Sequence, residues 1–563
     1  MNKWTLLTIF YFINLFSVTA QNQWANNFGS SNLDQGVDLL LDNFGNLYTT
    51  GFFEGTSDFD PSTNGTANLN SIGQRDFYIA KYDGLGQLAW AKSIGGGNQE
   101  YSKSIQTDAS GNIYVTGDFS GLVDFDPSMG FSLKDVNGAT DIFIAKYNQN
   151  GDFIWVKTFG GIGIESAKDL AVDGQGNIYI AGIFQGTTDF DPNGGTANLT
   201  SNGSFNSFIL NLDSNGNYIW VSRIESSTSN FVNQIALDYS GNINAVGYFQ
   251  GSTDFDPSSG VFNMTSVGSK SAYLCKWNTQ GQFVNALMIG GSGFEIGKAV
   301  TVDIQNNVYM TGDFRGVVDF DPSGNTNFLT SSGLRDAFIV KYTPQGTLSW
   351  VDKIGGAGED QASSITIGQN NELYVSGYFN ASMTLSNNKT FTSAGSSDTF
   401  FARYSKDGSL IFATKNGGNN GDESTAIVVD AFGNLFSTGW IQGTSSFGGE
   451  VLQSNGDRDI YLAKINMEAT SSTNTALFTE QEIQVFPNPS EGQFTINLEQ
   501  LESPQLTISI FDLSGKQIFN QQYNTSDLSD FQTSINLNNR YKGLFLIQIK
   551  GTTKVITKKI MLR

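Results

Sequence analysis

The stretch DLAVDGQGNIYIAG, residues 169–182, alternates apolar and polar side chains, turns at residues 174–177, and then runs apolar to a closing glycine. Gly and Asn supply the positive φ angles of a tight turn, so this stretch predicts two antiparallel strands. Apolar runs at 207–212 and 217–221 predict a third and a fourth strand. The closing glycine recurs about every 65 residues, at Gly51, Gly117, Gly182, Gly247, Gly312, Gly377 and Gly439.

Repeats of this length with four strands each are typical of propeller blades. The last three strands of a repeat are almost continuously apolar, so both of their faces must be covered, as they are when blades stack. We therefore predict an all-β fold in which residues 21–466 form a seven-bladed β-propeller. The seventh repeat lacks its Trp strand, and QWAN at 23–26 matches AWAK at 89–92. The N-terminal strand is thus predicted to close the last blade and to remove two sheet edges.

The composition excludes several classes of function. The formal net charge of −22 argues against nucleic-acid binding, which requires a basic surface. The chain has no histidine, which excludes Ser-His-Asp catalysis, histidine-ligated zinc and histidine pH switches. The one cysteine, Cys275, replaces an alanine of other repeats and is interpreted as a small core residue.

Residues 1–20 are predicted to be a signal peptide, with Lys3 before an apolar segment and cleavage between Ala20 and Gln21. The alternative is an uncleaved anchor. No later segment approaches about 20 apolar residues, so no transmembrane segment is expected in the mature protein.

Acidic residues recur with the repeats at two places. The first lies just before the innermost strand, where a seven-fold ring near one mouth of the central channel is expected to bind a ligand: Asp34, Glu100, Glu165, Asn230, Glu295, Asp360 and Asp422. The alternative is that each side chain accepts backbone hydrogen bonds from a neighbouring loop.

The second is an Asp-Phe-Asp-Pro tetrad in five repeats, between the second and third strands. Calcium binds six to eight oxygen ligands, so these carboxylates are candidate calcium ligands: Asp58, Asp60, Asp124, Asp126, Asp189, Asp191, Asp254, Asp256, Asp319 and Asp321. The alternative is a turn organised by Asp-Pro with the Phe packed inward. No EF-hand spacing supports the metal.

The pattern of a D-x-x-G-N turn, an I-Y-V-T-G strand and D-x-F-I-A-K-Y, as in residues 108–117 and 141–147, resembles the bacterial SBBP β-propeller repeats. The resemblance covers most of residues 21–466. It implies a propeller and no particular activity.

Residues 467–482 lack periodicity and are predicted to be a linker. Residues 483–563 carry alternating short strands, which predicts a small β-sandwich. This segment resembles the type A C-terminal sorting domain of the type IX secretion system, through Pro487, Asn488, Pro489, Gly515, Lys516 and Gly543. The resemblance implies the type IX machinery as a partner, and a protein secreted from or attached to the outer surface of a Gram-negative cell. The alternative is an ordinary sandwich that serves as a binding module.

These observations favour a non-enzymatic binding or adhesion scaffold for an unknown glycan or protein. Two alternatives stay open. A glycan-cleaving enzyme needs only two suitably spaced carboxylates, although catalytic residues usually break a repeat's symmetry. A calcium-dependent structural component of the cell surface would use the recurring acidic residues.

Overall fold

The computed structural model describes residues 23–467 without 257, 259, 369 and 370, and residues 483–563 without 500–504, 513–515, 525–529, 538–540 and 551–554. The predicted cleavage site at Ala20 and Gln21, residues 468–482 of the predicted linker, and Gly515 lie outside the described residues. Met467, the first residue of the predicted linker, is instead buried in the core of the last unit. The described chain is built from antiparallel β-strands, which confirms the all-β prediction. No helix in this described part is long and apolar enough to cross a membrane.

Residues 24–465 form repeated units of four long strands, which pair in chain order from an inner to an outer strand. The inner strands are β2 (Gln35–Leu41), β8 (Glu100–Thr107), β14 (Glu165–Val172), β20 (Asn230–Leu237), β26 (Glu295–Val302), β32 (Asp360–Ile367) and β38 (Asp422–Val429). The second strands are β3 (Leu47–Phe53), β9 (Ile113–Phe119), β15 (Ile178–Phe184), β21 (Ile243–Phe249), β27 (Val308–Phe314), β33 (Leu373–Phe379) and β39 (Leu435–Ile441).

The third strands are β6 (Asp76–Tyr82), β12 (Asp141–Tyr147), β18 (Asn206–Leu212), β24 (Ser271–Trp277), β30 (Asp336–Tyr342), β36 (Asp398–Tyr404) and β42 (Asp459–Ile465). The outer strands are β7 (Leu88–Gly96), β13 (Phe153–Gly161), β19 (Tyr218–Ser226), β25 (Phe283–Gly291), β31 (Leu348–Gly356), β37 (Leu410–Gly418) and, for the last unit, β1 (Trp24–Phe28).

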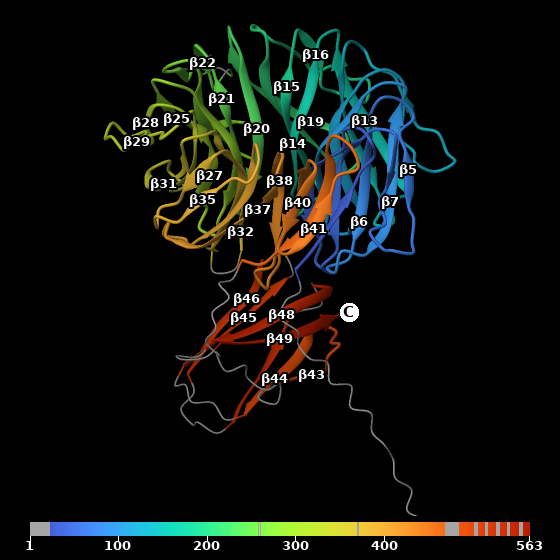
Figure 1. The fold of residues 1–563 in the computed structure, drawn as a ribbon, viewed down its shortest axis with the longest axis vertical. Helices are drawn as coiled ribbons and strands as arrows, with labels where there is room; N and C mark the ends of the chain where they lie inside the picture. Colours follow the sequence, from blue (N-terminus) through green and yellow to red (C-terminus); the bar gives the residue numbers. More distant parts are fainter. Residues whose placement is uncertain are drawn as a thin grey trace, which may run out of the picture.

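The inner strands enclose a common centre. Each contacts the next from β2 through β8, β14, β20, β26 and β32 to β38, and β38 in turn contacts β2. In Figure 1 the blue first unit accordingly lies beside the orange last unit. We call this arrangement the ring.

The N-terminal strand joins the two ends of the ring. β1 pairs with β42 so that Trp24 lies opposite Lys464, just as Trp90 lies opposite Lys81 within the first unit. Trp24 Nε1 also donates a hydrogen bond to the Gly84 carbonyl oxygen of the neighbouring unit at 3.3 Å. The predicted pairing of this strand with the last repeat is confirmed.

The connection between the second and third strands holds a short hairpin that the sequence analysis missed. In six of the units its first strand pairs with the outer strand of the preceding unit, as Val123 does with Gly96, and so extends that sheet to six strands, whereas the hairpin of the first unit forms a separate two-stranded sheet. These strands are too short to show an alternating pattern. The hairpins are β4 (Thr56–Asp58) with β5 (Asn68–Asn70), β10 (Val123–Asp124) with β11 (Leu133–Lys134), β16 (Thr187–Asp189) with β17 (Asn198–Thr200), β22 (Ser252–Asp254) with β23 (Asn263–Thr265), β28 (Val317–Asp319) with β29 (Phe328–Thr330), β34 (Ser382–Thr384) with β35 (Thr390–Thr392), and β40 (Thr444–Phe447) with β41 (Glu450–Gln453).

The D-x-x-G-N turn between the inner and second strands is organised by its aspartate. Asp108 Oδ1 accepts hydrogen bonds from the backbone amides of Ser110 and Asn112, and Oδ2 accepts one from the Asn112 side chain. Tyr114 donates to the same Oδ2, and Lys146 lies 3.5 Å from it. The recurring residues of the repeat therefore belong to one local hydrogen-bonding network.

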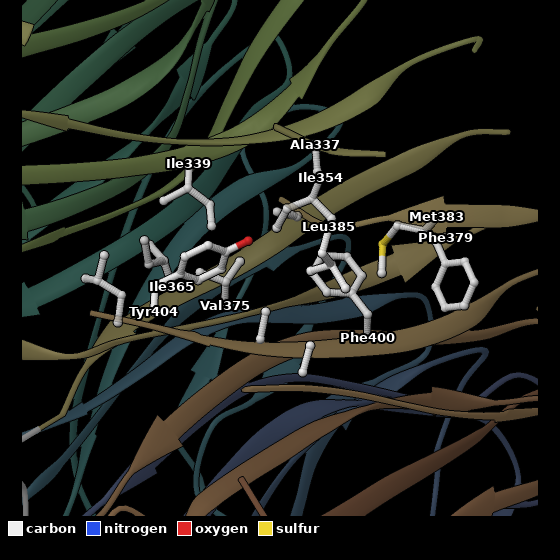
Figure 2. Close-up of a cluster of buried hydrophobic side chains, with 14 of the residues drawn as sticks. Ala337, Ile339, Ile354, Ile365, Val375, Phe379, Met383, Leu385, Phe400 and Tyr404 are labelled. Carbon is white, nitrogen blue, oxygen red and sulfur yellow. The ribbon is translucent and has the colours of Figure 1, made fainter. Parts of the chain in front are cut away.

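The hydrophobic core lies between neighbouring units. Figure 2 shows Ala337, Ile339 and Ile354 of one unit facing Ile365 and Phe400 of the next. All of these side chains are buried. Each sheet thus buries both faces, which explains the continuously apolar strands. Cys275 is buried in a core of this kind, as expected.

The C-terminal residues form two sheets with one shared core. The strands are β43 (Ile483–Phe486), β44 (Gln493–Glu499), β45 (Gln505–Asp512), β46 (Gln517–Asn524), β47 (Asp530–Asn536), β48 (Gly543–Lys550) and β49 (Val555–Leu562). One sheet has the order β43-β44-β47 and the other β46-β45-β48-β49. Ile496 of the first sheet and Ile508 and Ile547 of the second belong to the shared core.

Candidate functional site

The acidic ring predicted from sequence is present but buried. Each inner strand begins with one of its members, except that Asp34 lies just before β2, and all are 0% exposed: Asp34, Glu100, Glu165, Asn230, Glu295, Asp360 and Asp422. The sequence analysis placed these side chains near a channel mouth where a ligand could reach them. The structure corrects this placement, because the loop that precedes each inner strand covers them.

Each of these side chains holds that loop through the backbone amide four residues earlier or through nearby backbone groups. Glu100 Oε2 accepts a hydrogen bond from Gly96 N at 2.9 Å, and Asp360 Oδ2 accepts one from Gly356 N at 2.7 Å. The amide Asn230 accepts from Ser207 N at 2.7 Å instead. The arrangement is the hydrogen-bonding alternative stated above, and we call it the loop clamp.

A second set of buried polar residues, which sequence analysis missed, begins the third strands. Its members are Asp76, Asp141, Asn206, Ser271, Asp336, Asp398 and Asp459. Asp141 and Asp336 likewise accept the amide four residues earlier, Asn137 N at 3.0 Å and Ser332 N at 2.9 Å. The same repeat period would have revealed this set, since its members recur at one position of each repeat.

The chemical partner of each clamp carboxyl differs between units. Thr188 and Ser445 donate a hydroxyl hydrogen bond to Glu165 and Asp422 respectively. Valine or methionine takes this position beside Glu100, Glu295 and Asp360. The second carboxyl oxygen of each of these three residues has no hydrogen-bond partner among the described residues.

This difference appears in the pKa values. Burial raises the pKa of Glu100 and of Glu295 to about 8, and that of Asp360 to about 7. For Asp422, burial raises the pKa only to about 6, because hydrogen bonds from Ser445 and Gly418 favour the ionised form. Carboxyls without a hydroxyl donor are therefore expected to hold a proton near neutral pH.

The Asp-Phe-Asp-Pro tetrads close the short hairpins. In the third repeat, Asp189 Oδ1 accepts hydrogen bonds from the amides of Asp191 and Ala197, at 3.1 and 2.8 Å. Phe190 is fully buried and lies 4.7 Å from the Phe208 ring, and Asp191 accepts the amide of Asn193. Most of the other tetrad aspartates also accept hydrogen bonds from backbone amides: Asp58, Asp60, Asp124, Asp126, Asp254, Asp319 and Asp321. Asp256 accepts a hydrogen bond from a hydroxyl group. Within the described residues, no group of three or more metal-binding side chains is present.

We expect Asp189→Ala to destabilise the protein by about 1–3 kcal/mol, because two half-buried amides lose their acceptor. Asp189→Asn should retain most of the stability, since its oxygen can accept both hydrogen bonds. Thermal melting of both variants with calcium and with a chelator checks this expectation. A melting temperature that rises with calcium in the parent protein but not in Asp189→Asn would instead support a calcium site.

A different set of side chains occupies the half-exposed positions next to the loop clamps. On the inner strands these are Gln35, Val37, Tyr101, Lys103, Ser166, Lys168, Phe231, Asn233, Ile296, Lys298, Ser363, Glu423 and Thr425, while Gln361 at the same position is buried. They differ from unit to unit, although their neighbours repeat. Cationic side chains are frequent at this end of the ring. Arg75, for example, stacks on Phe52 and Tyr101, with its guanidinium carbon 5.2 and 5.5 Å from the two ring centroids.

Asn488, Lys516 and Gly543, three of the predicted sorting residues, make local contacts in the structure. Asn488, between Pro487 and Pro489, donates to the Lys559 carbonyl oxygen at 3.0 Å and accepts from Met561 N at 2.9 Å. Lys516 N donates to Asp512 Oδ1 at 2.9 Å. Gly543 lies near Phe44 of the ring, and Phe511 and Leu546 form a small buried cluster with Ala431. The sandwich therefore contacts the ring at the tight turns that follow the inner strands.

Comparison with known proteins identifies the C-terminal segment. Residues 484–563 match the family model described as the secretion system C-terminal sorting domain. This segment is a sorting domain of type IX secretion, and it indicates export to the cell surface or the surroundings of the cell. The predicted resemblance of this segment is thereby confirmed.

The relatives of the whole chain are distant. The chain is 24% identical over 494 residues to an uncharacterized WD repeat-containing protein of Acanthamoeba polyphaga mimivirus, covering 74% of this chain and 36% of the relative. It is 23% identical over 416 residues to the regulatory protein FlaEY of Caulobacter vibrioides, covering 69% of this chain and 42% of the relative. The chain thus spans less than half the length of either protein.

Two further matches are more limited. The chain is 31% identical over 108 residues to an endo-acting ulvan lyase of Formosa agariphila, which covers 19% of each protein. A solved structure of a member of the DUF4221 family from Bacteroides vulgatus covers 64% of this chain and 91% of that chain, at 11% identity and a TM-score of 0.28. This last likeness is too weak to support an argument about fold.

Proposed function

We propose that the ring is a seven-bladed β-propeller of the SBBP type, which acts as a binding or adhesion scaffold at the cell surface or in secreted form. A signal peptide and the type IX machinery export it. Its ligand, a glycan or a protein, binds the face that carries the clamped loops. The WD repeat name of one relative and the closed cycle of inner strands support the propeller.

One observation carries this proposal. The side chains that recur in every unit are buried and hold backbone groups, whereas the half-exposed side chains beside the loop clamps differ between units. Packing and loop geometry explain why the buried side chains recur, but they do not explain the identity of the half-exposed side chains. A rigid scaffold whose exposed positions vary in this way is suited to recognition of one asymmetric ligand.

The two alternatives receive less support. The clamp carboxyls that an enzyme could use are 0% exposed, so a glycan could not reach them without displacement of the covering loop. Calcium binding stays a prediction: in the tetrad of the third repeat, Oδ1 of each aspartate already accepts a hydrogen bond from a backbone amide, and no group of three or more metal-binding side chains is found among the described residues.

Binding by the mature protein to arrays of glycans and to cell-surface proteins tests the proposal. We expect saturable binding that Phe231→Ser with Tyr248→Ser abolishes, because these half-exposed rings stack at 4.9 Å beside the loop clamps. The matched control is Tyr239→Ser, on a tight turn at the other end of the inner strands. Binding that only the control disrupts would place the ligand elsewhere, and no binding to any glycan or surface protein would contradict the proposal.

A further inference from the structure

Cations concentrate around the centre of the ring, at the end that carries the loop clamps. We define the central cationic cluster as Lys168, Lys270, Lys298, Arg335 and Arg458. Each of these side chains is half-buried, and each lies on an inner strand or at the residue just before a third strand. This local gathering is unusual in a protein whose formal net charge is −22.

Four carboxylates beside the cluster already have a cationic partner. Glu54 pairs with Arg75 at 2.6 Å and Asp118 with Lys103 at 3.6 Å. Arg335 pairs with both Asp313, at 3.5 Å, and Glu359, at 2.9 Å.

By contrast, Lys168, Lys270, Lys298 and Arg458 form no ion pair with any described carboxylate. Lys168 donates a hydrogen bond to the Ser166 hydroxyl at 3.2 Å, and burial, together with nearby Lys103, lowers its pKa. The unpaired carboxylate near Lys298 and Arg458 is Glu423, and burial raises its pKa. The five cations of the cluster outnumber the four carboxylates that lie near them, Asp118, Asp313, Glu359 and Glu423.

Aromatic rings accompany these cations. The Arg458 guanidinium carbon lies 3.8 Å from the centroid of the Trp440 ring, and Lys270 Nζ lies 4.2 Å from that of Tyr248. The Phe231 ring stacks on the Tyr248 ring. Stacking orders the guanidinium in advance, so that its planar donors lose less freedom when they bind a carboxylate or sulfate.

We propose that the central cationic cluster binds an acidic glycan, one whose sugar rings carry carboxylate or sulfate groups. This inference rests on the proposed function and names the ligand class of the same face. The unpaired cations bind the anionic substituents through charge-assisted hydrogen bonds, and Arg458 can bind one with two parallel donors. The half-exposed rings of Phe231 and Tyr248 beside Lys270 offer an apolar surface to the sugar rings. A long nucleic acid is disfavoured because the acidic remainder of the protein repels it.

Calorimetry of the mature full chain tests this inference with an oligogalacturonate, a sulfated chondroitin oligosaccharide, neutral maltoheptaose and a single-stranded oligonucleotide. We expect an acidic oligosaccharide to bind at least about tenfold more tightly than maltoheptaose, with an affinity that falls as salt is added. Lys298→Gln with Arg458→Gln should weaken binding about tenfold or more. Arg458→Lys should give an intermediate loss, because it keeps the charge but not the paired donors.

The control is Lys134→Gln with Lys406→Gln, which removes the same charge away from the cluster and should change the affinity less than about twofold. Thermal melting shows whether each variant is folded. Acidic glycan binding that the cluster variant leaves unchanged, equal binding of maltoheptaose, or preferential binding of the oligonucleotide would overturn the inference. The proposed function would survive if the protein still bound another glycan or protein through the same face, and would fail if nothing bound.

Discussion

Deletion of residues 24–28 is expected to lower the midpoint of thermal unfolding by about 10 °C or more. The deletion removes the whole pairing of β1 with β42 and exposes the third strand of the last unit. It also removes Phe28, which is 1% exposed and whose ring lies 5.3 Å from Tyr82 and 5.9 Å from Phe59 of the first unit. Truncation of one buried phenylalanine alone costs about 3–5 kcal/mol.

Phe28→Ala separates packing from strand pairing, since it keeps the β1 backbone and should give a smaller loss than the deletion. Phe131→Ala is the matched control, because this ring is 83% exposed and its loss should change stability by less than about 0.5 kcal/mol. Equal melting temperatures for the parent and the deletion would contradict closure by the N-terminal strand.

The midpoint of unfolding is expected to be highest near pH 5 and to fall by about 10 °C or more by pH 9. Burial raises the pKa of Glu100 and Glu295 from 4.5 to about 8, and that of Asp34, Asp360 and Asp422 from 3.8 to about 6 or 7. The folded state therefore binds these protons more tightly than the unfolded state does. Their contribution is complete below the unfolded pKa and is lost as the pH rises through 6 to 8.

Other carboxylates have a lowered pKa, and they determine how far stability extends to low pH. Hydrogen bonds, mainly from Asn112 and Asn242, lower the pKa of Asp108 and Asp238 despite burial. These carboxylates stabilise the folded state above their unfolded pKa, and this contribution is lost as the pH falls below about 4.

Substitutions at the loop clamps show which carboxyl groups cause the loss of stability at alkaline pH. Glu100→Gln with Glu295→Gln should flatten the decline between pH 6 and pH 9, because glutamine keeps the shape and binds no proton. Asn230 shows that an amide can occupy this position. Val318→Thr should lower the pKa of Glu295 by supplying the hydroxyl that Thr188 supplies to Glu165.

Glu450→Gln is the control, since this carboxylate is exposed and should leave the slope unchanged. If the double glutamine variant declines as steeply as the parent, the repulsion of the net negative charge rather than the clamp carboxyls governs the pH dependence.

The repeat period, the strand order, the closing strand and the sorting tail could all be predicted from sequence. These features depend on local patterns: turn residues with positive φ, runs of apolar side chains, and a Trp strand missing at one end and present at the other. Trp24 was assigned correctly because its neighbours match those of Trp90.

Only the folded chain showed which polar residues are buried. Glu100 and Lys103 are three residues apart on β8 and both have ionisable side chains, yet Glu100 is buried under a loop and Lys103 is half-buried beside the Tyr101 ring. The short hairpins likewise could be recognised only in the structure, where most of them pair with the preceding unit. Local sequence specifies a strand and its turn. The solvent exposure of a side chain and the partners of a charged group depend instead on neighbouring units, whose residues are far away in the sequence.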